Sequence, residues 1–336
     1  MTPTITLKDI ANEVNKTVVT VSKALRGHPD ISKETREHIQ NVAQKLGYTP
    51  NLIARKLSSS QTRSIGLVVP RIAHPFFSEA IEAIFEEARR LDYDIILMVT
   101  GEDEQLEIQN IQSLLAFQVD GLLISVTERT QDTAIFKTIL DKGKKLVFFD
   151  RVIENLGCCS VVCDNFEGTY NLVKFALKNG YKKFGYFAGY KNNYIGTERR
   201  NGFEKALADN NIQLNPDWII EGGFDHNDGY SDFMKLYETG NLPEIIITVS
   251  YAAALGAMSA IRKLDLIIPR DIDLMAFGDS YYNQFIKPSL TVARLDSREM
   301  GRQALAALIN AIESKTAPSE KIVVPTKLIV NETGLG

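Results

Sequence analysis

From residue 64 onward, short β-branched runs alternate with longer amphipathic stretches, and this alternation restricts the possible fold more than any other feature. Such alternation is typical of parallel, doubly wound sheets covered by helices on both faces. It continues to the C-terminus, which is long for one sheet, so we expect two similar lobes with a cleft between them. The expected strands are 65–69, 94–99, 121–125, 146–149, 184–187, 244–249, 273–277 and 322–330, and the expected helices include 76–91, 104–117, 166–179, 199–210 and 252–264.

The first sixty residues have a different pattern, that of three short helices. Thr6 and Thr17 are placed to cap the first two apolar stripes, and a third helix begins at Ser32 and ends at Gly47. Asn15 lies at the sharp turn between the first two stripes, where its tolerance of the left-handed conformation is useful. Two helices joined by a tight turn and closed by a third predict a helix-turn-helix.

The charge distribution separates the same two regions. The 336-residue chain carries a net charge of −4, from 38 basic and 42 acidic residues. Residues 1–60 hold nine Lys and Arg against five Asp and Glu, so this region carries 9 − 5 = +4 and the remainder carries 29 − 37 = −8. A basic module on an acidic body favours binding of the module to a polyanion. Together with the helix-turn-helix pattern, this predicts binding to double-stranded DNA.

In a helix-turn-helix, the second helix enters the major groove and presents its N-terminal residues to base edges. Val18 and Val19 can respond only to the shape of the groove and to thymine methyl groups, whereas Lys23 can contact phosphate or guanine. The expected DNA contacts are Thr6, Leu7, Thr17, Val18, Val19, Thr20, Ser22, Lys23, Asn51, Arg55 and Leu57.

The segment from about 50 to 59 starts like a helix, with Pro50 in its first turn, and ends in a Ser-rich stretch. A helix this short is not stable alone in water. One interpretation is a hinge helix that folds on DNA and inserts Leu57 into the minor groove as an apolar wedge. The alternative is a plain linker.

Several functional classes receive no support from the sequence. No apolar run is long enough for a membrane helix, and the N-terminus lacks the apolar region of a secretory signal. The clustered cysteines, Cys158, Cys159 and Cys163, suit reduced thiols in a cytoplasm better than disulfides or a metal site. None of the four histidines has an acidic or nucleophilic residue at the sequence spacing of a known catalytic motif. The sequence also contains no nucleophile elbow and no phosphate-binding loop. We therefore expect neither an enzyme nor a cofactor.

The sequence closely resembles the lactose-repressor (LacI/GalR) family. The head motifs that carry the resemblance are Leu7-Lys8-Asp9-Ile10-Ala11, Thr20-Val21-Ser22-Lys23-Ala24-Leu25, Ser32-Lys33-Glu34-Thr35-Arg36, Leu46-Gly47-Tyr48-Thr49-Pro50-Asn51 and Ala54-Arg55-Lys56-Leu57. The body motifs are His74-Pro75-Phe76-Phe77, Phe149-Asp150-Arg151, Asp164-Asn165, Arg199-Arg200-Asn201-Gly202-Phe203, Ala254-Leu255-Gly256-Ala257, Leu290-Thr291 and Glu299-Met300-Gly301.

The resemblance implies a body like that of periplasmic sugar-binding proteins, in which the chain crosses between the lobes three times. It also implies that the segment after Pro50 is a hinge helix. The implied domains are residues 1–60, with the hinge helix at about 50–59, and residues 61–336 for effector binding and dimerisation. We place lobe 1 at about 61–162 and 291–322, and lobe 2 at about 163–290 and 323–336.

Candidate effector-binding residues come from predicted strand ends and from the family motifs. Aromatic faces suit a sugar ring or a planar base, Asp150 can accept from hydroxyls, and Arg199, expected to open a helix, is a bidentate donor. The candidates are Phe76, Phe77, Ser125, Asp150, Asn193, Arg199, Phe224, Ser250 and Asp279. No metal ligands are expected among them.

Two departures from the family pattern concern the effector. Ser250 and Tyr251 stand where the family commonly has an Asn-Asp pair, and Asp279 lies one place later than the family's usual Asp. These changes leave fewer fixed hydrogen bonds to hydroxyls, so the resemblance does not identify the effector. A sugar or sugar derivative is the default, and a purine-like or other non-sugar ligand is the alternative. Arg199 with Asn193 would also accept an anionic group.

The sequence therefore predicts a cytoplasmic, sequence-specific transcriptional regulator, expected to be a repressor, that binds operator DNA as a homodimer under the control of a small-molecule effector. The prediction of a dimer rests on the absence of a leucine heptad after the last expected strand. Two alternatives have a similar body. A solute-binding protein would need a signal peptide, and a DNA-binding protein without a ligand would show no ligand-induced thermal shift.

Overall fold

The computed structural model describes residues 5–25, 27–48, 62–128, 130–190, 193–314 and 320–336. The chain divides into two compact units, residues 1–62 and 63–336, which we call the head and the body. The expected hinge helix, with Asn51, Arg55 and Leu57, lies outside the described residues.

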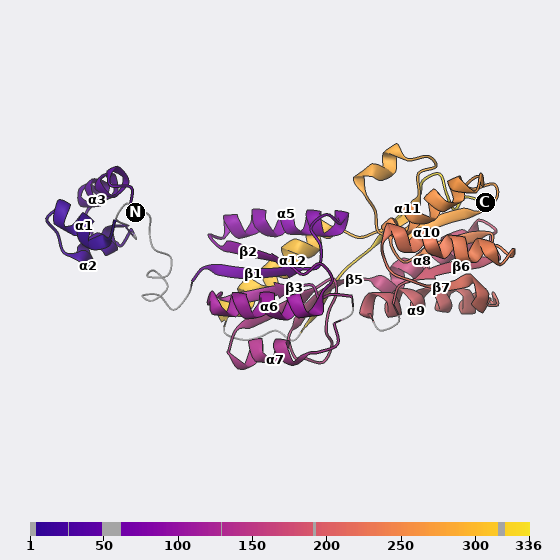
Figure 1. The fold of residues 1–336 in the computed structure, drawn as a ribbon, viewed down its shortest axis with the longest axis horizontal. Helices are drawn as coiled ribbons and strands as arrows, with labels where there is room; N and C mark the ends of the chain where they lie inside the picture. The colour runs from indigo at the N-terminus through magenta and orange to yellow at the C-terminus, as the bar shows by residue number, and fades with distance from the viewer. Residues whose placement is uncertain (1–4, 26, 49–61, 129, 191–192, 315–319) are drawn as a thin grey trace. The chain divides into compact units, whose positions relative to one another are not determined.

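The described part of the head contains three helices, α1 (Leu7–Glu13), α2 (Val18–Leu25) and α3 (Lys33–Lys45) (Figure 1). Thr6 caps α1 in a reciprocal capping box with Asp9, and Ser32 caps α3. Asn15 has a φ of 49°, which confirms the predicted left-handed turn between α1 and α2. The three helices enclose a small apolar core made of Ile10, Ala11, Val14, Val21, Ala24, Ile39 and Ala43.

The body contains two six-stranded sheets (Figure 1). The first has the order β11-β5-β4-β3-β1-β2 and is entirely parallel. Its strands are β1 (Ser64–Val69), β2 (Asp94–Val99), β3 (Gly121–Ile124), β4 (Lys145–Phe149), β5 (Cys159–Cys163) and β11 (Lys321–Val324). Its helices are α5 (Pro75–Arg90), α6 (Glu104–Ala116), α7 (Ala134–Asp141) and α12 (Ser297–Ser314).

The second sheet has the order β12-β10-β9-β8-β6-β7, and β12 is antiparallel to β10. Its strands are β6 (Phe184–Ala188), β7 (Ile219–Glu221), β8 (Ile245–Thr248), β9 (Asp273–Phe277), β10 (Thr291–Arg294) and β12 (Lys327–Ile329). Its helices are α8 (Asn165–Lys178), α9 (Tyr194–Asp209), α10 (His226–Glu238) and α11 (Tyr251–Lys263), with short 3₁₀ turns η1 (Pro216–Trp218) and η2 (Tyr281–Phe285).

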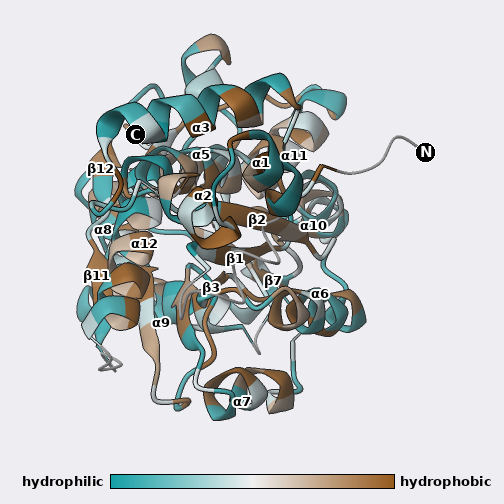
Figure 2. Ribbon diagram, turned by 90° about the vertical axis from the view of Figure 1, so that its left-hand side faces the viewer, coloured by the Kyte–Doolittle hydropathy of each residue, from teal (hydrophilic) through white to brown (hydrophobic). Residues whose placement is uncertain are grey.

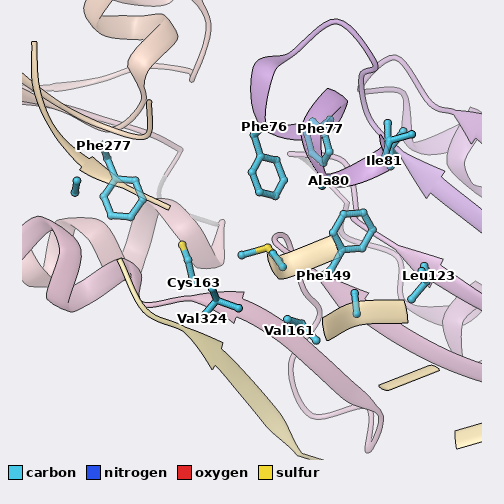
Figure 3. Close-up of a cluster of buried hydrophobic side chains, with 14 of the residues drawn as sticks. Phe76, Phe77, Ala80, Ile81, Leu123, Phe149, Val161, Cys163, Phe277 and Val324 are labelled. Atoms are coloured by element: carbon cyan, nitrogen blue, oxygen red, sulfur yellow. The ribbon is translucent and has the colours of Figure 1, made fainter. Parts of the chain in front are cut away.

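Hydrophobic strands fill the interior of each lobe, because parallel strands are covered on both faces. All six residues of β1 are buried, and Figure 2 shows hydrophobic colour on β1 and β2. One hydrophobic cluster continues from lobe to lobe and includes Phe149 at the end of β4, Cys163 at the end of β5 and Phe277 at the end of β9 (Figure 3). None of the helices in the described ranges has both the length and the apolar character that a bilayer crossing requires.

The described elements pass from one lobe to the other after β5, after β10 and after β11, as the resemblance implies. Three details of the prediction are wrong. Thr291–Arg294 pairs in the second sheet rather than belonging to lobe 1, so the second crossing follows β10. The expected strand 322–330 is two strands in different sheets, because Pro325, which lacks a backbone N–H, lies between them. The helix expected at 199–210 begins at Tyr194.

Candidate functional site

The N-terminal half of α2 presents an apolar and hydroxyl-bearing surface on the head. Val18 and Val19 are 43% and 65% exposed, which is unusual for valine in a domain whose other valines are buried or half-buried. Thr17 caps the helix by accepting from the Thr20 backbone N–H at 3.1 Å, and the two hydroxyls lie 2.9 Å apart. The exposed valines are therefore held at the start of a capped helix, where base contacts are made in a helix-turn-helix.

The remaining expected DNA contacts of the described head have other neighbours. The Lys23 ammonium donates to Asp30 at 3.0 Å, and Ser22 is half-buried. The Thr6 side chain is engaged in the α1 capping box, and Leu7 packs partly buried against the head core. In the head alone, Lys23 is thus paired with Asp30. If Lys23 contacted DNA, its ion pair with Asp30 would be replaced by a contact with phosphate or guanine.

A cavity of about 740 Å³ lies between the two lobes. Its walls come from residues at or after the carboxyl ends of parallel strands, which is where open α/β sheets bind ligands. The cavity brings together seven of the predicted effector residues, namely Phe76, Phe77, Asp150, Arg199, Phe224, Ser250 and Asp279. Phe76 and Phe77 begin α5, and the other five follow β4, lie on α9, or follow β7, β8 and β9.

Two predicted effector residues do not line this cavity. Asn193 caps α9, and its side-chain oxygen accepts from the backbone N–H groups of Ile195 at 2.9 Å and Gly196 at 3.4 Å. Ser125 follows β3 and is fully buried in lobe 1. Because Asn193 takes the capping position, Arg199 lies in the second turn of α9 rather than opening the helix.

Arg199 is buried, and neutral groups position its side chain. Its Nε donates to Asn165 Oδ1 at 2.8 Å and its Nη1 to the Val249 carbonyl at 2.6 Å. The guanidinium lies 3.6 Å from the centre of the Phe277 ring. Burial lowers the pKa of Arg199 from its usual value, opposed by the nearby Cys163 and Asp150. The side chain is thus a fixed cationic donor at the cavity wall.

Asp150 is the opposite charge in the same wall. Its φ of 60° places a non-glycine residue in the left-handed region, which turns the chain sharply after β4. Burial raises the pKa of Asp150, while the charges of Arg151 and Arg199 act in the opposite direction. The cavity therefore combines aromatic walls with a buried carboxyl group, Asp150, and a buried guanidinium donor, Arg199.

Several further residues line the cavity that were not predicted from the sequence, and His74, Arg151 and Phe277 are the most informative of them. His74 precedes α5, and burial together with nearby arginines lowers its pKa to about 4, so its imidazole is neutral near pH 7. Arg151 is held by Glu102 at 2.9 Å and Glu128 at 3.2 Å. Both His74 and Arg151 lie inside the quoted family motifs, so those motifs contained the signal.

Comparisons with known proteins agree with this architecture. Residues 6–51 match the family model described as bacterial regulatory proteins, lacI family, and residues 62–332 match the model described as periplasmic binding proteins and sugar binding domain of LacI family. The chain belongs to the LacI family. It is a DNA-binding transcriptional regulator controlled by a small-molecule effector.

The LacI-family relatives match over nearly their whole length. The chain is 31% identical over 314 residues to the HTH-type transcriptional repressor PurR of Haemophilus influenzae (strain PittEE), covering 92% of each protein. It is 29% identical to the NTD biosynthesis operon regulator NtdR of Bacillus subtilis, covering 98% of this chain and 99% of NtdR. The fold matches that of the Lac repressor dimer bound to operator and the anti-inducer ONPF, with a TM-score of 0.87, 23% identity and coverage of 99% and 100%.

These findings confirm the predicted family, fold class and regulatory function. They also agree with the expectation of a regulator rather than an enzyme, since family members are transcriptional regulators.

Proposed function

We propose that this LacI-family regulator is a repressor whose effector binds in the cavity between the lobes and changes the affinity of the head for operator DNA. The observation that carries the proposal is that buried Asp150 and buried Arg199 both line a cavity with aromatic walls. A sugar or sugar derivative offers hydroxyls to the carboxyl group and an oxygen to the guanidinium, while its ring packs on the Phe76 and Phe224 faces.

A planar heterocycle such as a purine is the second candidate for the effector. It is favoured by the number of aromatic rings in the wall and by the neutral His74, whose buried Nδ1 has no hydrogen-bond partner among the described residues. A ring nitrogen or N–H could pair with that imidazole. The replacement of the family's Asn-Asp pair by Ser250 and Tyr251 also reduces the contacts available to hydroxyls.

A thermal-shift screen of the full chain tests these candidates. The panel contains hexoses, disaccharides, sugar acids, hexose phosphates, nucleobases and nucleosides, since any ligand that binds the folded body raises its melting temperature. We expect a sugar to raise it in the wild type, and we expect Asp150→Asn to abolish that shift. A shift produced only by nucleobases, and retained in Asp150→Asn, selects the heterocycle, and no shift from any compound rejects an effector of either class.

We also infer that the regulator acts as a cytoplasmic homodimer. Two apolar surfaces support a second copy of the chain. One is the edge strand β2, whose residues after Asp94 are only partly buried, and the other is the exposed aromatic group Tyr281, Tyr282 and Phe285 on η2. Light scattering of the wild type should give a dimer, and a tetramer would contradict the inference. Phe285→Ser should shift the protein toward monomer.

The hinge segment would bend the operator. In a dimer, the recognition helices lie one helical turn apart on a pseudo-palindromic site, and paired Leu57 side chains would enter the minor groove between them. Leu57→Ala should weaken operator binding and reduce bending in a circular-permutation gel assay. Wild-type bending by this variant would remove the wedge and leave the segment as a linker.

A further inference from the structure

A row of alternating charges leads from the effector cavity to the boundary between the lobes. Arg151 Nη1 lies 2.9 and 3.0 Å from the two carboxylate oxygens of Glu102, and its Nη2 lies 3.2 Å from Glu128. Arg71 Nε lies 3.7 Å from Glu102, and Arg71 Nη2 lies 3.0 Å from Asp225. Four of these residues belong to lobe 1, and Asp225 precedes α10 in lobe 2.

The inner end of this row touches the cavity walls of both lobes. The Arg151 guanidinium carbon lies 5.8 Å from the ring centres of Phe77, in lobe 1, and Phe224, in lobe 2. Both rings line the effector cavity. A cation placed between two rings on different lobes responds to any change in the distance between those rings.

The inner and outer ends of the row differ in burial. The side chains of Arg151, Glu102 and Glu128 are only 10–14% exposed, and the backbone N–H of Glu128 donates to Glu102 at 2.9 Å, so the inner end is fixed. At the outer end, the Arg71 and Asp225 side chains are 47% and 37% exposed. Exposed pairs contribute little to stability and are weakened by salt, so this end can open and close reversibly.

We propose that the Arg71–Asp225 pair is a latch that holds the two lobes closed, and that Arg151 and Glu102 are the positioning residues that connect it to the effector cavity. The inference rests on the proposed effector control, because it assigns the device by which occupancy of that cavity changes the angle between the lobes. A ligand that separates or draws together Phe77 and Phe224 moves Arg151, and through Glu102 it moves the Arg71 side chain toward or away from Asp225. The latch is thus the two-state element that effector binding shifts.

Interlobe distances in the full chain test the latch without any effector. Nitroxide labels on Arg89→Cys in α5 and Glu238→Cys in α10 lie on exposed positions of different lobes. The distance between the two nitroxides is measured by pulsed electron–electron double resonance. Labelled chains are diluted with unlabelled protein, so that distances within one chain dominate. The parent chain, whose three cysteines are buried or half-buried, reports background labelling.

We expect short distances to dominate in low NaCl and the fraction of longer distances to rise in high NaCl. Asp225→Asn should give a larger fraction of long distances already in low salt, and the double variant Arg71→Gln/Asp225→Asn should give no further increase. Asp225→Glu should restore the wild-type distribution because it keeps the charge. Asn caps a helix about as well as Asp, so Asp225→Asn leaves the start of α10 intact. The matched control is Asp209→Asn, which removes an exposed ion pair with Lys205 inside α9 and should change nothing.

A wild-type distribution in Asp225→Asn would overturn the latch, as would equal shifts in Asp225→Asn and Asp225→Glu, because the effect would then not depend on charge. These outcomes are independent of the effector screen. If the latch behaves as expected and no compound binds, the proposed effector control fails while the latch stands.

Discussion

The head and the body place the side chains proposed to bind DNA and effector in opposite environments. In the head, Val18 and Val19 are exposed on a capped helix, and the apolar core is made by other residues. In the body, Asp150 and Arg199 are buried in the wall of a cavity, and Arg199 is held by side-chain and backbone oxygens. The proposed DNA contacts can therefore change at little cost to folding, whereas the proposed effector contact Arg199 also takes part in the packing of the body.

The largest test of this contrast is Arg199→Ala in the body. The substitution removes the guanidinium donor from the Val249 carbonyl and from Asn165 Oδ1, which then accepts only from the Cys163 thiol, and it opens a void beside Phe277. We expect a loss of about 3 kcal/mol in the free energy of unfolding of the body, measured by urea denaturation, together with loss of effector response. Operator binding without effector should persist.

The neighbouring Arg200 provides a matched control for that experiment. Arg200 is partly exposed and pairs with Glu204 at 2.7 Å and Glu221 at 3.0 Å. Arg200→Ala should cost less than about 1 kcal/mol and leave the effector response intact. Equal losses for the two variants would show that burial does not distinguish functional from surface arginines in this body.

A smaller effect is expected at Glu107, a buried carboxyl group away from the cavity. Glu107 accepts from the Thr127 backbone N–H at 2.9 Å and the Thr130 hydroxyl at 2.8 Å, yet burial raises its pKa to about 7. Because this pKa is raised on folding, the stability that Glu107 contributes is fully present below its unfolded pKa and is lost as pH rises through about 7. Burial raises the pKa of Glu128 to about 7 as well, so it acts in the same direction.

We therefore expect the body to become more stable as the pH falls from about 8 to about 6. Glu107→Gln should raise the free energy of unfolding at the upper pH by on the order of 2 kcal/mol and flatten, without abolishing, its dependence on pH. Urea denaturation at several pH values measures both. A variant that keeps the wild-type slope would show that Glu107 stays ionised in the folded body.

In the head, the turn residue Asn15 should have a smaller effect still. Its φ of 49° is costly for most residues with a Cβ but tolerated by Asn and free for Gly. Asn15→Ala should lower the free energy of unfolding of the head by about 1 kcal/mol, while Asn15→Gly should leave it nearly unchanged. Thermal denaturation followed by circular dichroism compares them, and equal stabilities would mean that the turn relaxes in the Ala variant.

The same contrast explains which features were predictable from the sequence. Local signals identified the caps at Thr6 and Thr17 and the start of the third helix near Ser32, and hydrophobic runs placed β2 and β9 at their observed bounds. These features depend on residues close together in the chain. Strand ends and family motifs then placed seven of the nine predicted effector residues in the cavity wall.

Features that depend on distant partners were not predictable in the same way. Whether β10 joins the first or the second sheet is decided by its pairing with β9 and β12, which no local pattern contains. Asn193 was expected to bind the effector, but it caps a helix whose start lay outside the apolar periodicity. The ion pair between Arg71 and Asp225 joins residues far apart in sequence, and only the packing of the two lobes brings them together.

The smallest change in stability is expected for Val19→Ser in the head, together with a clear change in function. Val19 is 65% exposed, so its replacement should alter the free energy of unfolding by less than about 0.5 kcal/mol. A valine in the major groove contacts thymine methyl groups, so the variant should bind a selected operator more weakly, by roughly 1 kcal/mol. Replacing thymine by uracil in that operator removes only the methyl groups and should weaken the wild type while leaving Val19→Ser unaffected.

Gln44→Ser, on an exposed position of α3, is the matched control and should respond to uracil as the wild type does. If Val19→Ser and the wild type lose equal affinity on uracil operators, Val19 makes no methyl contact. The exposure of Val19 would then have to be explained by contact with another partner. The contrast between a DNA-contacting surface on the head and a separate apolar core would no longer hold.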